Sequence, residues 1–216
     1  MRLLRAGVHF YLVGIIILTL GISLAIISML GTSPYDALLV GLFRSFGLTI
    51  GTWEVVVGTV MILGNALAEK KRPEYFAFIT SVITGIGIDS WLFILRLFIV
   101  PDAWLGQWIC LVLSIIFTGL GIAIYLQSEV APNPMDRSML VVSNLTGWNV
   151  TYSRALINVI LVITAFFFGG AIGIGTLLNA VLTGVIIGYL LPYVSRLRKI
   201  SLKKLEDPEK RIAEGK

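Results

Sequence analysis

The sequence predicts an all-α integral membrane protein with six transmembrane helices and two short re-entrant helices, arranged as a 3+3 inverted repeat. Three observations lead to this fold class: the composition, six long stretches poor in charge, and a self-similarity at a spacing of 100 residues. Of the 216 residues, 57% are hydrophobic and only 13% are charged. Soluble domains carry about 25% charged residues, so the composition excludes an ordinary water-soluble domain.

Six stretches are long and apolar enough to cross a bilayer. A helix rises about 1.5 Å per residue and the hydrocarbon core is about 30 Å thick, so a span needs about 20 residues. The run 155–195 contains no charged residue and must hold two spans, divided by the glycines between 169 and 175. The predicted spans are 6–30, 52–68, 75–98, 103–128, 152–168 and 174–194.

Two further helical segments, 33–46 and 133–146, are too short to cross, because fourteen residues cover only about 21 Å. An internal repeat explains both. Aligning the chain with itself at an offset of 100 pairs Pro34 with Pro134, Asp36 with Asp136 and Gly47 with Gly147. The chain therefore divides into a first repeat at 1–100, a second repeat at 101–195 and a basic tail at 196–216.

The distribution of Lys and Arg predicts the topology. If the short segments do not cross, the N-terminus, the basic loop at 69–72 and the tail all lie in the cytoplasm, as the positive-inside rule requires. Three spans in each half then make the halves inverted. Arg44 is the basic residue that falls on the predicted outer side. The tail holds eight basic and four acidic residues, which indicates contact with anionic lipid, and no nucleic-acid partner is predicted.

Both short segments begin with the sequence of a helix N-terminus: an N-cap residue, a proline and, two positions later, an aspartate. A helix that starts at membrane depth exposes unpaired N–H groups and a partial positive charge, so it must be buried in protein or face a watered cavity. Inverted-repeat transporters place such ends around their substrate. The predicted substrate site is Ser33, Pro34, Asp36, Asn133, Pro134, Asp136 and Arg137. Two alternatives stay open: the aspartates cap only their own helices, and Arg137 pairs with Glu129 or Asp136.

Other polar residues within the spans form a second group of candidates. Asp89 has no acidic counterpart in the second half and is predicted as a coupling-ion site, the alternative being a packing residue near the outer interface. Ala180, Gly184 and Gly188 form a stripe that predicts close helix packing. The predicted supporting polar residues are Asn65, Asn158 and Asn179. Glu54 and Arg154 lie near the ends of the short segments.

No catalytic motif or metal-ligand pattern is present in the sequence. The chain has one histidine, His9, and one cysteine, Cys110, so neither a disulfide nor the usual metal sites are expected. We therefore predict no catalytic residue, no metal site and no cofactor, and expect that the protein is not an enzyme.

Three motifs resemble a known family: Gly31-Thr32-Ser33-Pro34-Tyr35-Asp36, the stretch from Gly47 to Thr52, and the stretch from Gly85 to Asp89. Together with the Gly175-Thr176-Leu177-Leu178-Asn179 element, they are similar to the YitT/YczE/YyaS-like bacterial polytopic membrane proteins. The resemblance covers residues 10 to 195. It implies a bacterial inner-membrane location and supplies no substrate.

The leading hypothesis for function is a small-solute secondary transporter or channel, with the substrate between the two half-helix N-termini. A membrane scaffold or accessory subunit that binds a cytoplasmic partner through its tail is the first alternative. An intramembrane enzyme built on Asp36, Asp89 and Asp136 is the second. The expected partners are the lipid bilayer and an unidentified small solute. The glycine-rich helix faces leave a homo-oligomer open.

Overall fold

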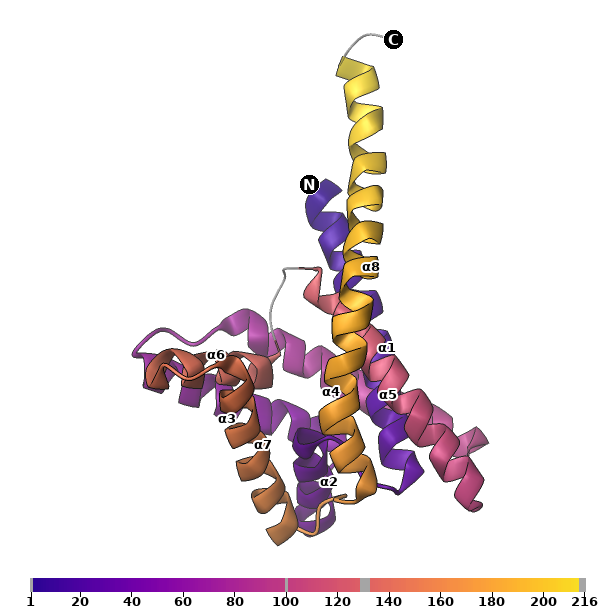
Figure 1. Cartoon of the computed structure of the whole chain (residues 1–216), viewed down its shortest axis with the longest axis vertical. Helices are drawn as coiled ribbons and strands as arrows, with labels where there is room; N and C mark the ends of the chain where they lie inside the picture. The colour runs from indigo at the N-terminus through magenta and orange to yellow at the C-terminus, as the bar shows by residue number, and fades with distance from the viewer. Residues whose placement is uncertain (1, 100, 129–132, 214–216) are drawn as a thin grey trace.

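The computed structural model describes residues 2–99, 101–128 and 133–213, and the regular structure within these ranges is entirely α-helical (Figure 1). Six of the described helices are long and apolar enough to cross a membrane, which confirms the predicted class of membrane protein. The helices are α1 (Arg2–Ser28), α2 (Pro34–Phe46), α3 (Ile50–Glu69), α4 (Tyr75–Phe98), α5 (Trp104–Leu126), α6 (Pro134–Thr146), α7 (Val150–Phe167) and α8 (Ile174–Ala213). The two short ones, α2 and α6, have 13 residues each.

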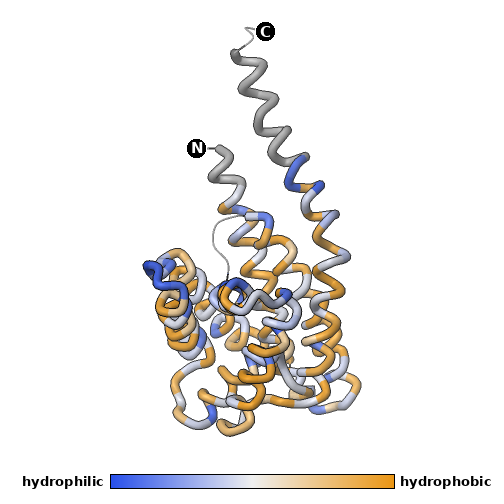
Figure 2. The backbone as a smooth tube through the Cα atoms, turned by 60° about the vertical axis from the view of Figure 1, so that its left-hand side comes forward, coloured by the Kyte–Doolittle hydropathy of each residue, from blue (hydrophilic) through white to orange (hydrophobic). Residues whose placement is uncertain are grey.

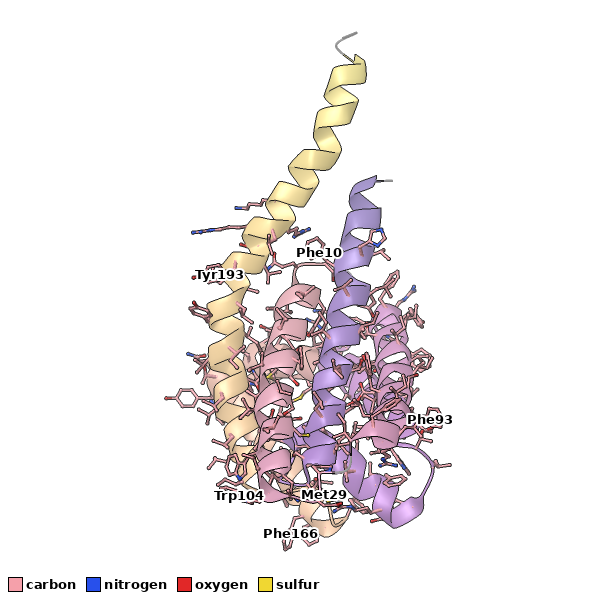
Figure 3. All side chains as sticks on the ribbon, turned by 90° about the vertical axis from the view of Figure 1, so that its right-hand side faces the viewer. Phe10, Met29, Phe93, Trp104, Phe166 and Tyr193 are labelled. Atoms are coloured by element: carbon pink, nitrogen blue, oxygen red, sulfur yellow. The ribbon has the colours of Figure 1, made fainter. Side chains whose placement is uncertain are left out.

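The start of α1 and the end of α8 lie at the same end of the helix bundle (Figures 1 and 2). Phe10 and Tyr193 lie toward this end, whereas Met29, Trp104 and Phe166 lie at the opposite one (Figure 3). The loop between α3 and α4 is also at the end that holds the termini, because the Tyr11 hydroxyl donates a hydrogen bond to Thr80 Oγ1 near the start of α4, at 2.7 Å.

The core is organised around α1, which packs most extensively against α5 and also contacts α4. Tyr11, Ile15, Leu18 and Ile22 are buried on α1 at spacings of three and four residues, so they form one face of the helix. Each of the six long helices also carries exposed large apolar side chains, as expected where helices contact lipid. Figure 2 shows hydrophobic residues along most of the bundle.

The short helices begin and end where the sequence predicted. Ser33 and Asn133 are their N-caps, and Gly47 and Gly147 follow their last residues with φ angles of 77° and 72°, which favour glycine. Each short helix packs against a long helix from the other half of the chain, α2 against α7 and α6 against α3.

Arg44 has a local partner that the sequence did not indicate. Its guanidinium donates to the Gly169 carbonyl oxygen at 2.8 Å, and the neighbouring Ser45 hydroxyl donates to the Phe168 carbonyl oxygen at 3.0 Å. Arg44 thus ties the end of α2 to the turn between α7 and α8. This contact accounts for a basic residue at the end of the bundle opposite the termini.

Two features of α8 differ from the sequence prediction. The helix continues to Ala213, well beyond the predicted end of the span at 194, so the span and the start of the tail form one helix. The stripe of Ala180, Gly184 and Gly188 was predicted to pack closely on another helix. That prediction is wrong within the described chain for the two glycines, since a Cβ atom at either would meet no described heavy atom within 4 Å.

Candidate functional site

A polar cavity of about 90 Å³ lies between the N-termini of α2 and α6. This volume has room for several water molecules or a small solute. All eight helices contribute to its wall, so residues from the whole chain meet at one place. Its lining includes Ser33, Pro34, Tyr35, Asp36, Glu54, Thr84, Tyr125, Asn133, Asp136, Arg154, Asn158, Asn179 and Thr183.

The start of α2 forms one side of the cavity. The Ser33 hydroxyl oxygen accepts a hydrogen bond from the Asp36 backbone N–H at 3.2 Å, and the hydroxyl donates to Asp36 Oδ2 at 2.6 Å. Asp36 is only 6% exposed. The capping role predicted for Asp36 is therefore present, and the same carboxyl group also lines the cavity.

The start of α6 forms another side of the cavity in a different way. Asn133 Oδ1 accepts a hydrogen bond from the Met135 backbone N–H at 3.0 Å. The Tyr125 hydroxyl on α5 donates a short hydrogen bond to Asp136 Oδ2. Asp136 is therefore held by a side chain from another helix, whereas Asp36 is held by its own N-cap.

Glu54 on α3 is a cavity residue that the sequence placed only near the end of a short segment. It is 1% exposed, and its Oε1 atom accepts no hydrogen bond from any described residue. Tyr35 lies beside it, 5% exposed, and its hydroxyl interacts with the Glu54 carboxyl group. Buried polar atoms in proteins are nearly always hydrogen-bonded, so the Glu54 Oε1 atom, which has no other partner among the described residues, has capacity left to bind water or a ligand in the cavity.

Arg154 on α7 brings a positive charge to the same cavity. It interacts electrostatically with Asp136 and Tyr125 but lies within 4.0 Å of no described carboxylate oxygen. Asn158, one turn later on α7, also lines the cavity, and its Oδ1 atom has no described hydrogen-bond partner. The cavity therefore holds buried carboxyl groups and a half-buried guanidinium, and some of their hydrogen-bonding atoms have no partner among the described residues.

Three of the predicted residues lie together outside this cavity. Pro134, Arg137 and Asn65 line a separate, smaller pocket beside the loop between α3 and α4. Arg137 makes ion pairs with Glu69 and Glu74, each at 2.8 Å. The predicted partner Asp136 points to Tyr125 instead, and Glu129 lies outside the described residues.

Asp89 also lies away from the cavity lining. Its carboxylate accepts a hydrogen bond from the Thr49 hydroxyl at 2.6 Å and another from the Gly51 backbone N–H at 2.8 Å. Asp89 on α4 thereby satisfies the N-terminus of α3. The structure gives Asp89 a structural task, and its role as a coupling-ion site stays a prediction.

Of the supporting asparagines, the structure brings Asn158 and Asn179 to the cavity and leaves Asn65 outside. Sequence reasoning did not include Tyr35, Glu54, Tyr125 or Arg154 in the site. The spacing of 100 residues between Glu54 and Arg154 is a signal that could have found both, because the same offset relates the two aspartates. No comparable signal marks Tyr125. Among the described residues, no group of three or more His, Cys, Asp or Glu is placed to hold a metal ion.

Comparison with known proteins places the chain among bacterial membrane proteins. Residues 6–192 match a family described as a family of unknown function, DUF6198. The chain is 44% identical over 187 residues to the uncharacterized protein YyaS of Bacillus subtilis, covering 87% of this chain and 93% of that protein. It is 35% identical over 184 residues to the uncharacterized membrane protein YczE of the same organism, covering 85% and 84% of the two chains.

A more distant relative comes from Haemophilus influenzae, with 24% identity over 189 residues, covering 87% of this chain and 84% of that protein. No solved structure matches the chain. The matches span nearly all of the helix bundle and confirm the resemblance predicted from the motifs around Pro34 and Gly85. By this similarity, the chain belongs to the YczE/YyaS-like family of membrane proteins, DUF6198.

Proposed function

We propose that the protein is a secondary transporter or channel for a small solute, which binds in the cavity between the N-termini of α2 and α6. The observation that carries the proposal is the cavity itself: a space walled by all eight helices and lined by charged and polar side chains, in which the Glu54 Oε1 and Asn158 Oδ1 atoms have no hydrogen-bond partner among the described residues. Charged and polar residues within the membrane are costly, and they mark solute or ion pathways in membrane proteins. We propose a carrier rather than an enzyme.

We further propose that the chain is a 3+3 inverted repeat in which α2 and α6 are re-entrant. Two observations support this arrangement. The short helices exchange partners between the halves, α2 packing on α7 and α6 on α3. Residues 99 or 100 positions apart line the cavity in pairs, as in Asp36 with Asp136, Glu54 with Arg154 and Thr84 with Thr183. Transporters of this design bind substrate between broken helices of the two repeats.

The proposed orientation places both termini and the loop at 69–74 in the cytoplasm of a bacterial cell. These segments lie at one end of the bundle and carry most of the basic residues. A scan on a Cys110→Ala background tests the topology, with single cysteines at Ser45 and Thr146, which are exposed near the last residues of α2 and α6, labelled from each side by a charged thiol reagent. Labelling of position 45 from outside and of position 146 from inside supports inverted repeats. Labelling of both only from the same side contradicts them.

Transport itself is tested with purified protein in liposomes and a panel of isotope-labelled amino acids, amines, carboxylates and sugars. We expect uptake of at least one class above that of empty liposomes, and its loss in the Asp36→Asn, Asp136→Asn double variant. The Arg72→Gln variant is the control, because Arg72 is exposed and lies outside the cavity lining. If no member of the panel moves, the transporter proposal fails.

A further inference from the structure

We propose that the ligand of this cavity is a small zwitterion, whose cationic group binds beside Glu54 and whose carboxylate binds Arg154. The inference rests on the proposed function and names the substrate class of the same site. It starts from two opposite charges that line one cavity without forming an ion pair with each other.

The wall formed by α2 and α3 is suited to a cation. Glu54 is 1% exposed, and no described cationic nitrogen lies within 4.0 Å of its carboxylate. Asp36 interacts with it electrostatically, and the Tyr35 hydroxyl lies beside the Glu54 carboxyl group. Neither carboxyl group forms an ion pair with a described cation, so a bound ammonium group would supply the missing counter-charge.

The wall formed by α6 and α7 is suited to an anion. Arg154 presents a guanidinium, whose planar donors match a carboxylate in a two-point contact. Asp136 interacts with it electrostatically, but no Arg154 nitrogen lies within 4.0 Å of an Asp136 oxygen, and Asp136 Oδ2 accepts the Tyr125 hydroxyl. The first N–H groups of α6, beside Asn133, add a partial positive charge to this wall.

A ligand of one charge would satisfy only one wall. A simple cation would leave Arg154 with Asp136, beyond ion-pair distance, as its counter-charge, and a simple anion would share the cavity with the carboxyl groups of Asp36 and Glu54. A zwitterion satisfies both walls at once. The cavity of about 90 Å³ restricts it to a small molecule.

The first experiment uses the unmodified full chain in lipid nanodiscs and isothermal titration calorimetry. The probes are glycine, 3-aminopropanoate and 4-aminobutanoate, which differ in the distance between their charges. Each is compared with the amine that lacks its carboxylate and the acid that lacks its amine, for example methylamine and acetate for glycine. We expect at least one zwitterion to bind about tenfold more tightly than both of its single-charge relatives. Equal binding of an amine or an acid, or binding of none of the probes, overturns the inference.

Two variants then test which wall binds which charged group of the ligand. Glu54→Gln should remove the advantage of the zwitterion over the acid, because the amine loses its counter-charge. Arg154→Gln should remove the advantage over the amine. The control is Arg72→Gln, an exposed residue outside the cavity lining, and it should leave both ratios unchanged. Equal losses for all probes in both cavity variants contradict the assignment of the walls.

Uptake into liposomes separates this inference from the proposed function. If a zwitterion binds with the expected selectivity but is not moved across the membrane, the ligand class stands and the transport proposal fails. If the protein moves amines, acids or sugars in preference to every zwitterion, transport stands and the zwitterion inference fails.

Discussion

The two halves of the chain place their last two long helices very differently. In the first half, α3 and α4 pack closely, and a Cβ atom at Gly85 would lie 2.4 Å from the Gly51 carbonyl oxygen. In the second half, the corresponding Gly184 on α8 has no described heavy atom within 4 Å of its Cβ position. The same pattern of spans therefore gives a closely packed pair of helices in the first half, α3 with α4 (the closed pair), and a separated pair in the second half, α7 with α8 (the open pair).

The open pair has a consequence for the cavity. An apolar groove of about 350 Å³ runs between α7 and α8, and it shares Pro34, Asn158 and Ala180 with the lining of the central cavity. In the first half, the residues that correspond to Asn158 and Ala180 are Gly58 and Ser81, and a Cβ atom at Gly58 would lie 2.3 Å from Ser81 Oγ. The comparison shows that the cavity is sealed by direct helix contact on one side and adjoins a groove on the other.

The largest expected effect comes from breaking the closed pair. Gly85→Val places a branched side chain where even one added carbon would overlap the Gly51 carbonyl, so we expect a loss of about 3 kcal/mol or more in stability. The matched change Gly184→Val has free space and should alter stability by less than about 0.5 kcal/mol. Thermal unfolding in detergent, followed by tryptophan fluorescence, measures both. Equal melting temperatures would show that the α3–α4 contact does not stabilise the fold.

A smaller effect is expected from the ion pairs that tie α6 to the loop between α3 and α4. Arg137→Gln removes contacts to both Glu69 and Glu74 and leaves the largely buried Glu69 without its closest cation. We expect a loss of about 1–2 kcal/mol, because one partner is partly exposed. The same thermal unfolding assay applies, with Arg72→Gln as the control. A melting temperature equal to that of the unmodified chain would contradict a stabilising role.

The Asp89→Asn variant distinguishes the two roles considered for Asp89, which are capping of α3 and binding of a coupling ion. Asp89→Asn weakens its hydrogen bonds to Thr49 and Gly51, and we expect a loss of about 1 kcal/mol from the N-terminus of α3. If uptake by the unmodified chain depends on protons or another cation, the Asp89→Asn variant should show the same dependence. The second half offers no carboxylate at the matching position, Gly188. Loss of ion dependence at an unchanged melting temperature would instead support the coupling-ion prediction.

The smallest effect is expected from the tail, which has no counterpart in the first half. Deletion of residues 197–216 removes the part of α8 that extends past the bundle (Figure 1), so the cavity should be unaffected. We expect unchanged membrane insertion and unchanged solute uptake, measured by membrane fractionation and the liposome assay. Full loss of cellular function with insertion and uptake intact would favour the scaffold hypothesis.

Much of the fold follows from hydropathy and from caps. The spans were predictable because a bilayer requires long apolar helices, and the short helices because Ser33, Asn133, Gly47 and Gly147 mark their ends. The extension of α8 was not predicted. A hydropathy pattern identifies where a span leaves the apolar layer of the membrane. It does not identify where the helix ends, because a helix can continue into water until capping or helix-breaking residues stop it.

The candidate site was only partly predictable. Local chemistry identified Ser33, Asp36, Asn133 and Asp136, because capping depends on neighbours in sequence. It also included Arg137, which lies outside the cavity lining because its side chain pairs with Glu69 and Glu74, which are distant in sequence.

The sequence by itself determined that this protein is a bundle of membrane helices, where those helices lie and where two short helices begin. These properties depend on local composition and on the thickness of the bilayer. Only the tertiary structure decided that Glu54, Tyr125 and Arg154 share a cavity, that Asp89 caps α3, and that α7 and α8 stay apart. These outcomes depend on which helix faces meet, and contacts between helices distant in sequence are set by packing of the whole chain.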